Sequence, residues 1–281
     1  MKTSRLTLTC ILLTLLAALP AMAGPRTFVS GLGNDANPGT RESAKRTFAS
    51  ALTVTDVGGE IVVLDSAGFA SSTLTINKSV SIIAPPGLYA GVRVSSGDSI
   101  VVATTGTVVL RGLTINNGAG PSGPNGIHLT SGGVLHIENC VISGFGIGGN
   151  GAGVRVSIGA TGARLFVKDT LVRENFNGIA IYAGTGSLDH VRLERNTGNG
   201  GLWVYGADPS ASISNSVASG NLGGINSSDG ATVTVSNCTV TNNRYGLVNT
   251  NGATMKSLGN NTVDGNWDGN IAGSITTIPS M

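Results

Sequence analysis

The sequence predicts an all-β protein that folds as a solenoid, and three observations support this prediction. Of the 281 residues 43 are Gly, only 11% are charged, and apolar and polar residues alternate in short segments. A unit of about 23 residues, marked by Asn and Gly, recurs along most of the chain. Such a composition excludes a disordered chain, and the glycines lack the three-residue period of collagen. We therefore predict one domain of stacked short strands joined by tight turns.

Residues 1–23 have the pattern of a secretory signal peptide. Lys2 and Arg5 are followed by the apolar run Leu6–Leu19, which is too short to cross a bilayer comfortably. An A-x-A pattern ends at Ala23, where we expect cleavage. The alternative is a buried N-terminal helix. With a signal peptide, the protein is expected to be secreted or periplasmic in a bacterium, with no membrane insertion after cleavage.

Each repeat contains three short alternating strands and two compact turns. The first strand ends at a polar residue in each copy: Asn139, Asp169, His190, Asn215, Asn237 and Asn260. A second Asn follows six residues later, at Asn175, Asn196, Asn221, Asn243 and Asn266. Asn tolerates the left-handed backbone of tight turns, and its amide can bond to the backbone and to an equivalent Asn. We therefore predict that the second set forms a structural asparagine ladder.

Three strands in a repeat of this length fit one coil of a single-stranded right-handed parallel β-helix. About nine such coils fit the chain, with strands about 4.8 Å apart between coils. A propeller would need longer blades with antiparallel hairpins, and the leucine-rich repeat signature is absent. Equivalent residues of successive coils should therefore lie in columns.

The strand alternation assigns two inward columns. One contains Ile137, Val167, Leu188, Ile213, Val235 and Leu258, and the other contains Cys140, Thr170, Val191, Ser216, Cys238 and Asn261. Cys140 and Cys238 are four coils apart, about 19 Å. A disulfide requires Cα atoms within about 7 Å, so both are predicted to be buried free thiols.

The N-terminal part of the mature chain lacks the repeat pattern. Residues 24–58 are predicted to form an opening turn and a capping helix, and residues 59–281 the β-helix. Ala44–Val54 is expected to be helical, with Phe48, Ala51 and Leu52 on one face. A cap is needed because a solenoid end exposes its apolar interior.

This opening also carries a family resemblance. Val29-Ser30, Gly33, Asp35 and the turn Asn37–Thr40 fit the pattern V-S-x-x-G-x-D-x-N-P-G-T, and Lys45–Leu52 and Gly58–Leu64 follow in order. The opening thereby resembles that of secreted bacterial β-helix proteins of the pectate-lyase-like superfamily. The resemblance implies the fold over almost the whole mature chain, but it specifies activity poorly because this fold carries lyases, hydrolases, epimerases and adhesins.

The lyase alternative has a small set of candidate catalytic residues: Asp189, Arg192, Arg173 and Glu194. Pectate lyases of this fold use acidic clusters for Ca²⁺ and a basic residue as the base, and Leu188-Asp189-His190 resembles a calcium-binding element of one such family. The acids are scattered, whereas Ca²⁺ usually takes several carboxylates. The simpler interpretation of this region is a ladder of salt bridges between coils, with Arg173 and Glu194 aligned on adjacent coils. No metal site and no cofactor are expected, apart from Ca²⁺ under the lyase alternative.

The third strand of each coil predicts a different site. Outward positions there include His128, Arg155, Tyr182, Trp203 and Tyr205 in a chain that is only 4% aromatic. Aromatic rings on a flat face can stack on sugar rings, with Arg adding polar contacts. The alternative interpretation is an ordinary surface covered by the variable loops.

Two functions follow from these observations. The first is a non-catalytic exported protein that binds polysaccharide or a cell-surface glycan, or that mediates surface contacts. The second is a lyase or glycoside hydrolase that acts on an acidic polysaccharide, which needs a complete set of catalytic residues that the sequence does not show. The net charge of +2 gives no basic excess for binding nucleic acid.

Overall fold

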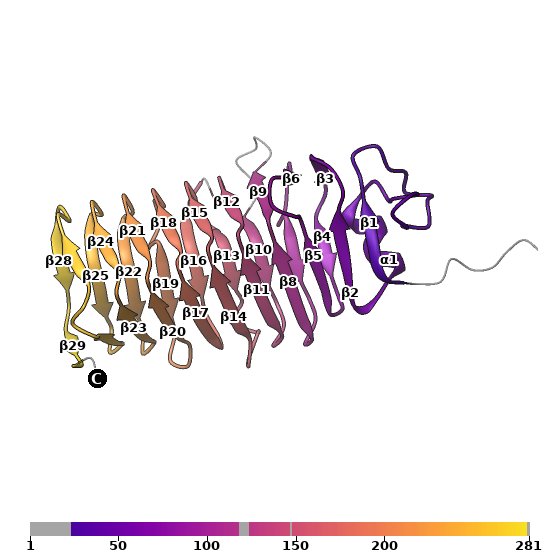
Figure 1. The fold of residues 1–281 in the computed structure, drawn as a ribbon. Coiled ribbons are helices and arrows are strands. Elements are labelled where there is room, and N and C mark those ends of the chain that lie inside the picture. The colour runs from indigo at the N-terminus through magenta and orange to yellow at the C-terminus, as the bar shows by residue number, and fades with distance from the viewer. Residues whose placement is uncertain (1–23, 118–123, 147, 280–281) are drawn as a thin grey trace, which may run out of the picture.

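The computed structural model describes residues 24–117, 124–146 and 148–279 of the chain. These residues form one elongated solenoid, with a single short helix at its N-terminal end (Figure 1). The predicted signal peptide, residues 1–23, lies outside the described residues. Within the described part of the chain, no helix has the length and apolar character needed to cross a membrane.

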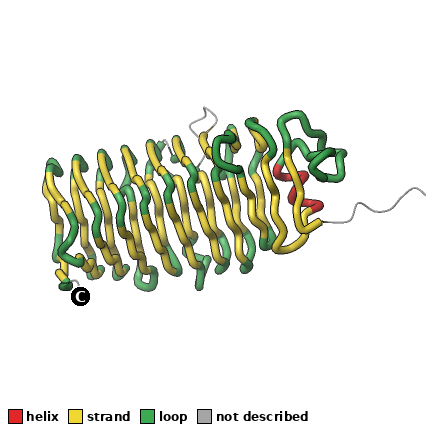
Figure 2. Tube along the Cα trace, in the orientation of Figure 1, coloured by secondary structure: helices red, strands yellow, loops and turns green. Residues whose placement is uncertain are grey.

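Three parallel sheets run along the solenoid, and each coil contributes one strand to each sheet (Figure 2). Sheet A comprises β1 (Gly24–Val29), β2 (Thr55–Val63), β5 (Val80–Ile83), β8 (Thr107–Arg111), β11 (Val134–Glu138), β14 (Arg164–Lys168), β17 (Thr185–Asp189), β20 (Ser210–Ser214), β23 (Thr232–Ser236), β26 (Thr254–Ser257) and β29 (Ile275–Thr277). Sheet B comprises β3 (Ala67–Ala70), β6 (Ala90–Val94), β9 (Leu113–Asn117), β12 (Val141–Ser143), β15 (Leu171–Arg173), β18 (Arg192–Glu194), β21 (Val217–Ser219), β24 (Thr239–Thr241) and β27 (Thr262–Asp264). Sheet C comprises β4 (Leu74–Ile76), β7 (Ile100–Val102), β10 (Asn125–Leu129), β13 (Ala152–Val156), β16 (Asn177–Ile181), β19 (Leu202–Tyr205), β22 (Gly223–Ser228), β25 (Tyr245–Thr250) and β28 (Gly269–Ala272).

The register between coils follows the predicted columns. Ile137 of β11 pairs with Leu110 of β8 on one side and with Val167 of β14 on the other. Residues about one repeat apart are thus direct neighbours, and the prediction of a right-handed parallel β-helix of about nine coils is confirmed.

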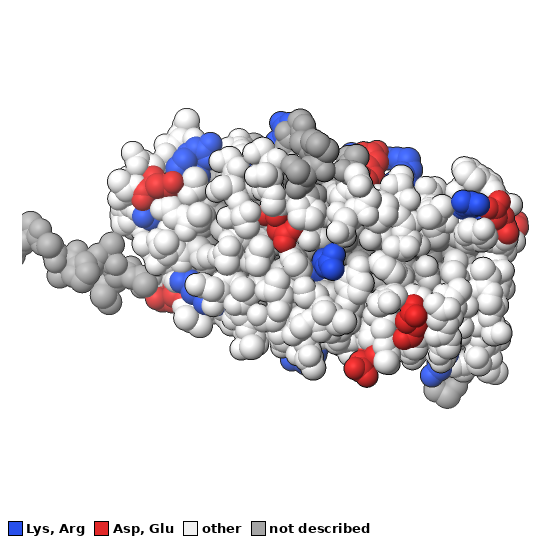
Figure 3. Space-filling model, turned by 180° about the vertical axis from the view of Figure 1, so that it is seen from behind, with Lys and Arg blue, Asp and Glu red and all other residues white. Residues whose placement is uncertain are grey.

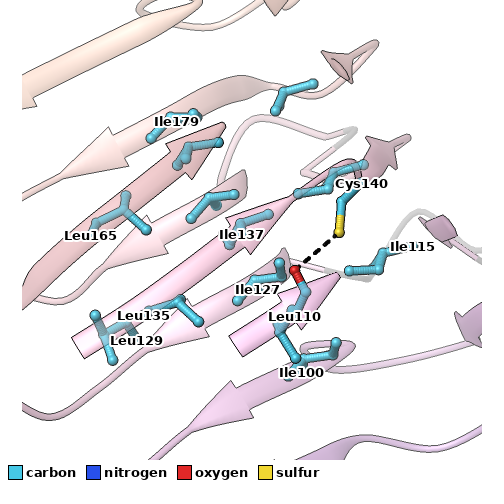
Figure 4. Packing of buried hydrophobic residues seen from close by; sticks show 14 of the residues in the cluster. Ile100, Leu110, Ile115, Ile127, Leu129, Leu135, Ile137, Cys140, Leu165 and Ile179 are labelled. Atoms are coloured by element: carbon cyan, nitrogen blue, oxygen red, sulfur yellow. Dashed lines mark hydrogen bonds between the residues drawn. The ribbon is translucent and has the colours of Figure 1, made fainter. Parts of the chain in front are cut away.

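The core is a continuous stack of aliphatic side chains from all three sheets. Figure 4 shows Leu110 and Ile137 of sheet A, Ile127 of sheet C and Ile115 of sheet B pointing into the same interior. Every strand needs only alternate apolar residues to build this core, because its other side faces solvent. The low charge and high Val and Ile content of the sequence are explained by this geometry.

The turn from sheet A to sheet B contains one residue with positive φ per coil. Asn139, Asp169, His190, Asn215 and Asn237 all have φ near +50°, as the repeat pattern indicated. The prediction is wrong for the last copy, where Gly259 rather than Asn260 takes positive φ and Ser257 rather than Leu258 pairs with Val235. Asn261 still bonds to the Cys238 N–H, so this turn contains one more residue than the others.

The turn from sheet B to sheet C contains the predicted asparagine ladder. Asn196 donates from its backbone N–H and from Nδ2 to Oδ1 of Asn221, both at 2.9 Å. Asn221 makes the same pair of bonds to Asn243, and Nδ2 of Asn221 also donates to the Leu193 carbonyl at 2.9 Å. Asn175 and Asn266 extend the ladder to its two ends. Each side-chain amide therefore satisfies backbone groups of the preceding coil and bonds to the amide of the next coil inside a buried turn.

At each end of the ladder, a residue outside the repeating set of asparagines bonds to the last asparagine. Phe145, which is fully buried, occupies the equivalent position above Asn175 and donates its N–H to Oδ1 of Asn175. At the other end, Oδ1 of Asn270 accepts from Nδ2 of Asn266 at 2.9 Å. An apolar ring replaces the amide where the stack begins, so the ladder does not end in an unpaired buried donor.

The N-terminal cap is formed by the helix α1 (Phe48–Val54) and the strand β1. Phe48, Ala51 and Leu52 are buried as expected, and Phe48 contacts Phe69 with ring centroids 5.1 Å apart. The prediction that the helix starts at Ala44 is wrong, because Oδ1 of Asp35 accepts the N–H groups of Arg46 and Thr47 and holds this segment outside the helix. The predicted boundary at residue 58 falls inside β2, and β1 is already the first strand of sheet A.

Both cysteines lie in the inward column and are free thiols, as predicted. Sγ of Cys140 donates to the carbonyls of Glu138 and Leu110, at 3.3 and 3.5 Å (Figure 4). Sγ of Cys238 makes the same kind of bond to Ser236, at 3.2 Å. Hydroxyl and amide groups occupy this column in other coils, where Ser216 bonds to the Ser214 carbonyl. The column thus satisfies backbone groups where the chain turns.

Replacing Asn221 with Ala should lower the free energy of unfolding by about 3 kcal/mol or more. The change removes the acceptor of two Asn196 donors and the donor to the Leu193 carbonyl, all of them buried. The measurement is urea unfolding followed by circular dichroism. Ser212→Ala, at an exposed outward position of β20, serves as the control and should change stability by less than about 0.5 kcal/mol. Equal stabilities of the two variants would contradict the structural role of the ladder.

The thiols of Cys140 and Cys238 should be inert in the folded protein. Burial raises the pKa of Cys140 to about 11 and also raises the pKa of Cys238, so little thiolate forms at neutral pH. A thiol reagent such as Ellman's reagent should react with both cysteines only after unfolding. Rapid reaction of the native protein, or an intramolecular disulfide under non-reducing mass spectrometry, would contradict this register.

Candidate functional site

The outer face of sheet C carries two neighbouring columns of side chains. Strand pairing places His128, Arg155, Ala180, Trp203 and Asn226 in one column. The second column is two residues further along each strand and contains Ser157, Tyr182, Tyr205 and Ser228. All five residues predicted for ligand binding are therefore on one face, within four adjacent coils.

Three aromatic rings form a contiguous cluster on this face. The ring centroids of Tyr182 and Trp203 are 5.4 Å apart, those of Trp203 and Tyr205 are 5.3 Å apart, and those of Tyr182 and Tyr205 are 6.0 Å apart. All three pairs meet edge to face, a favourable arrangement for aromatic quadrupoles. Tyr205 is 38% exposed, whereas Tyr182 and Trp203 are half-buried. The cluster thus holds its own geometry and still presents ring surface to solvent.

Polar groups border the aromatic cluster. The Arg155 guanidinium lies over the Tyr182 ring, 4.8 Å from its centroid, which is a cation–π contact. Nε1 of Trp203 donates to Oγ of Ser228 at 3.0 Å and fixes the indole orientation. Burial raises the pKa of Tyr182, so its hydroxyl stays protonated and can donate a hydrogen bond at neutral pH. Ring faces, a cation and hydroxyl groups are therefore available side by side.

His128 is held by groups from the coils on either side. Its Nδ1 lies 2.6 Å from Oδ2 of Asp98, and its Nε2 lies 2.6 Å from Oγ of Ser157. Nδ2 of Asn125 donates to the other carboxylate oxygen of Asp98 at 2.8 Å. Burial opposes the charge of Asp98, but the bonds from His128 and Asn125 outweigh it and hold the pKa of Asp98 below its usual value. Asp98 therefore remains a carboxylate at neutral pH.

The charged residues considered for catalysis on sheet B are all engaged in ion pairs. Arg173 and Glu194 are aligned on β15 and β18, as predicted. Glu194 pairs with Arg192 at 2.5 Å, while Glu174 pairs with Arg195 of the next coil at 2.8 Å. The Arg195 bond is the main cause of the lowered pKa of Glu174. Of these ion pairs only Glu174–Arg195 joins two coils, and the aligned Arg173 and Glu194 do not pair with each other: Arg173 contacts Glu174 at 3.4 Å.

Asp189 lies apart from this group, at the end of β17 in sheet A. Its carboxylate accepts from Nδ2 of Asn215 at 2.7 Å and from Oγ of Ser214 at 3.1 Å, and Oδ2 contacts Nδ1 of His190 at 2.9 Å. The Asn215 and His190 bonds lower the pKa of Asp189 to about 2. Asn237 continues this column by bonding to Asn215. Within the described ranges, no group of three or more His, Cys, Asp or Glu side chains is arranged to hold a metal ion.

Four residues near these sites were not among the sequence candidates: Asp98, Ser157, Glu174 and Arg195. Asp98, His128 and Ser157 are spaced by 30 and 29 residues, close to one coil each in this part of the chain, and that spacing was the available signal. Glu174 and Arg195 occupy equivalent positive-φ turn positions immediately before the asparagine ladder. Their pairing follows from that equivalence.

The sequence matches a known protein family. Residues 98–267 match the family described as "Right handed beta helix region", which spans more than half of the chain. The chain belongs to this family. A search of curated proteins finds no match to this sequence.

Solved structures share the fold at low sequence identity. The structure titled "Crystal structure of pectate lyase Pel9A" is similar with a TM-score of 0.62 and 14% identity, over 91% of this chain and 78% of that one. A rhamnogalacturonan lyase matches with a TM-score of 0.49 and 12% identity, over 83% of this chain and 66% of that one, just under two thirds of its length. At these identities the likeness is one of fold.

Proposed function

We propose that the protein is exported and binds a polysaccharide along the outer face of sheet C. The observation that carries the proposal is the cluster of Tyr182, Trp203 and Tyr205 with the Arg155 guanidinium against it. Aromatic residues are scarce in this chain, yet three of them lie in mutual contact on one face. Edge-to-face contacts tilt the rings relative to one another, so that sugar rings can be contacted at more than one angle.

The charge of the face favours an acidic or neutral glycan. Arg155 is placed against an aromatic ring, where a carboxylate of a uronic acid unit can reach it, and its planar fork suits that group. Figure 3 shows the opposite side of the solenoid from Figure 1, where charged residues are sparse and of both signs. A surface of this kind lacks the clustered positive charge that nucleic acid binding requires.

The fold relationship supports the same class of ligand by analogy. The similar structure of pectate lyase Pel9A belongs to a protein whose name states action on a polysaccharide. Fold alone does not transfer an activity, so the aromatic cluster, not the shared fold, is the main support for this ligand class. The proposal includes no lyase step and no Ca²⁺, because Arg192, Glu194 and Asp189 are engaged in the contacts described above.

The place of action remains the one that the N-terminal pattern predicts. Residues 1–23 have the charge, apolar run and cleavage pattern of a signal peptide, and export brings the protein into contact with extracellular or periplasmic polysaccharide. The balanced charge of the remaining chain is compatible with this role.

Tryptophan fluorescence provides a direct test, because the chain contains only two tryptophans, Trp203 and Trp267. Trp267 is 78% exposed and lies in the turn between β27 and β28. In Trp267→Phe the remaining indole is Trp203, and titration with polygalacturonate and with neutral polysaccharides should change its emission in a saturable way. A glycan array then identifies the preferred polymer.

Single substitutions on the face should separate binding from folding. Trp203→Ala and Tyr205→Ala should each weaken polysaccharide binding at least tenfold, since both remove ring surface from the same cluster. Trp267→Ala is the matched control and should bind normally. Unchanged glycan binding in Trp203→Ala and Tyr182→Ala, with normal melting temperatures, would overturn the proposal.

A further inference from the structure

Three side chains from three consecutive coils form a hydrogen-bonded chain on the face of sheet C. Asp98 precedes β7, His128 is on β10, and Ser157 directly follows β13. Oδ2 of Asp98 is 2.6 Å from Nδ1 of His128, and Nε2 of His128 is 2.6 Å from Oγ of Ser157. The order acid, imidazole and hydroxyl is the arrangement that activates serine as a nucleophile, and it is recognised by geometry rather than by chain order.

The hydrogen bond to Asp98 determines which nitrogen of the His128 ring carries the proton that faces the acid. The Asp98 carboxylate has no proton to donate, so Nδ1 of His128 must carry the proton of that bond. With the proton on Nδ1, Nε2 is the ring nitrogen that faces the hydroxyl of Ser157, and its lone pair can accept the hydroxyl proton when that nitrogen is unprotonated. The second oxygen of Asp98 is occupied by Asn125, which keeps the carboxylate in place. The ring is thus oriented as a general base toward Ser157.

All three groups are partly buried, and the residue that follows Ser157 is open to solvent. The side chains of Asp98 and His128 are 15% and 19% exposed. Ser157 begins the connection between β13 and β14, residues 157–163, which is longer than the neighbouring connections 130–133 and 182–184. The next residue, Ile158, is 78% exposed. Ser157 itself is half-buried, so a substrate reaches its hydroxyl from the exposed start of this connection.

Groups that can stabilise negative charge lie beside Ser157. The carbonyl of Ser157 accepts the Ala160 N–H at 3.0 Å, which closes a tight turn. The N–H groups of the two central residues, Ile158 and Gly159, donate to no acceptor within residues 24–117, 124–146 and 148–279. Arg155 is two residues before Ser157 on the same face. Free backbone N–H groups next to the nucleophile are the usual donors to an oxyanion.

We propose that Ser157, His128 and Asp98 form an esterase site that hydrolyses carboxylic esters carried by a polysaccharide. Ser157 is the nucleophile, His128 is the general base and acid, and Asp98 is a positioning residue that acts through His128. The esterase chemistry does not depend on the proposed binding function, but the choice of a polysaccharide ester rests on it, because the aromatic cluster begins one coil away at Tyr182. The proposal departs from the expectation of a non-catalytic protein.

The reaction balances with water as the only co-reactant. Oγ of Ser157 bonds to the ester carbonyl carbon while its proton passes to Nε2 of His128. The bond from that carbon to the alcohol oxygen breaks, and His128 returns the proton to the leaving oxygen. Water then adds to the acyl group on Ser157, His128 takes a proton from the water, and the acyl–serine bond breaks. The proton returns to Oγ, and a carboxylic acid is released.

A fluorophosphonate probe tests the nucleophile without requiring the natural substrate. The wild-type protein should be labelled at Ser157, as mapped by peptide mass spectrometry, and should hydrolyse 4-nitrophenyl acetate. Ser157→Ala should abolish labelling and reduce turnover at least 100-fold, whereas Ser212→Ala on β20 should match the wild type. The side chain of Ser157 bonds only to His128 within the described residues, so the melting temperature of Ser157→Ala should be unchanged.

Asp98 requires a readout that separates positioning from folding. Asp98→Asn should lower kcat at least tenfold with little change in KM, because the amide no longer enforces the tautomer that leaves Nε2 free. Asp98→Glu should recover part of the lost activity. An equal loss in Asp98→Asn and Asp98→Glu, both with native melting temperatures, would contradict the assigned role of Asp98.

The natural ester is identified by two parallel assays. Acetylated and methyl-esterified polysaccharides are incubated with the protein, and released acetate or methanol is measured, with Ser157→Ala as the blank. Trp203→Ala should lose activity on the polymer, whereas Trp267→Ala, which lies outside this face, should keep fluorophosphonate labelling, 4-nitrophenyl acetate hydrolysis and activity on the polymer. An unlabelled wild-type protein, or labelling that persists in Ser157→Ala, would overturn the esterase site and leave the binding proposal untouched. Full activity of Trp203→Ala on the polymer would instead overturn the link to the aromatic cluster.

Discussion

The buried asparagine ladder is the interaction on which the rest of the structure depends. At the turn between sheets B and C, backbone groups such as the Asn196 N–H and the Leu193 carbonyl are buried away from water. Each amide satisfies backbone groups of the preceding coil, as Asn221 does for Asn196 and Leu193, and bonds to the amide of the next coil. These bonds form only when equivalent turns lie directly over one another. The ladder therefore fixes the register in which sheet C begins in every coil that it spans, and the outward columns of that sheet inherit this register.

The sequence alone was sufficient to predict the fold because one coil of a β-helix is a local pattern that repeats. Alternation identified the strands. The residue type at turn positions such as Asn139 and Asn237 predicted the left-handed backbone that the structure has there. Prediction was wrong where one coil differs from its neighbours. The last sheet A turn contains an extra residue, so Gly259 took the role expected of Asn260. In the cap, the bonds that Asp35 makes to Arg46 and Thr47 postpone the start of the helix, a contact that no periodicity indicates.

In the candidate site, too, the sequence predicted what repeats from coil to coil and missed what is particular to one coil. Alternation predicted that Tyr182, Trp203 and Tyr205 share a face, since this requires only the side of the sheet on which each residue lies. His128 bonds to Asp98 and Ser157 on the adjacent coils, but neither residue is its partner in strand pairing. These bonds therefore depend on the direction of the side chains as well as on the register of the strands. Asp98 precedes its strand and Ser157 follows its strand, outside the segments that alternation describes. The pairing of Glu174 with Arg195 likewise lies in a turn.

Each coil adds one strand to each sheet, and this arrangement affects how such a protein can change in evolution. The residues from Asp98 to Tyr205 that face outward on sheet C come from successive coils and contact those coils and the next one, where Ser228 accepts from Trp203. Coils further along the solenoid, from β23 onward, touch none of these side chains through strand pairing. Duplication or loss of a whole unit there would lengthen or shorten the molecule and leave the chemistry at the other end intact. Such a scaffold separates the evolution of size from the evolution of activity.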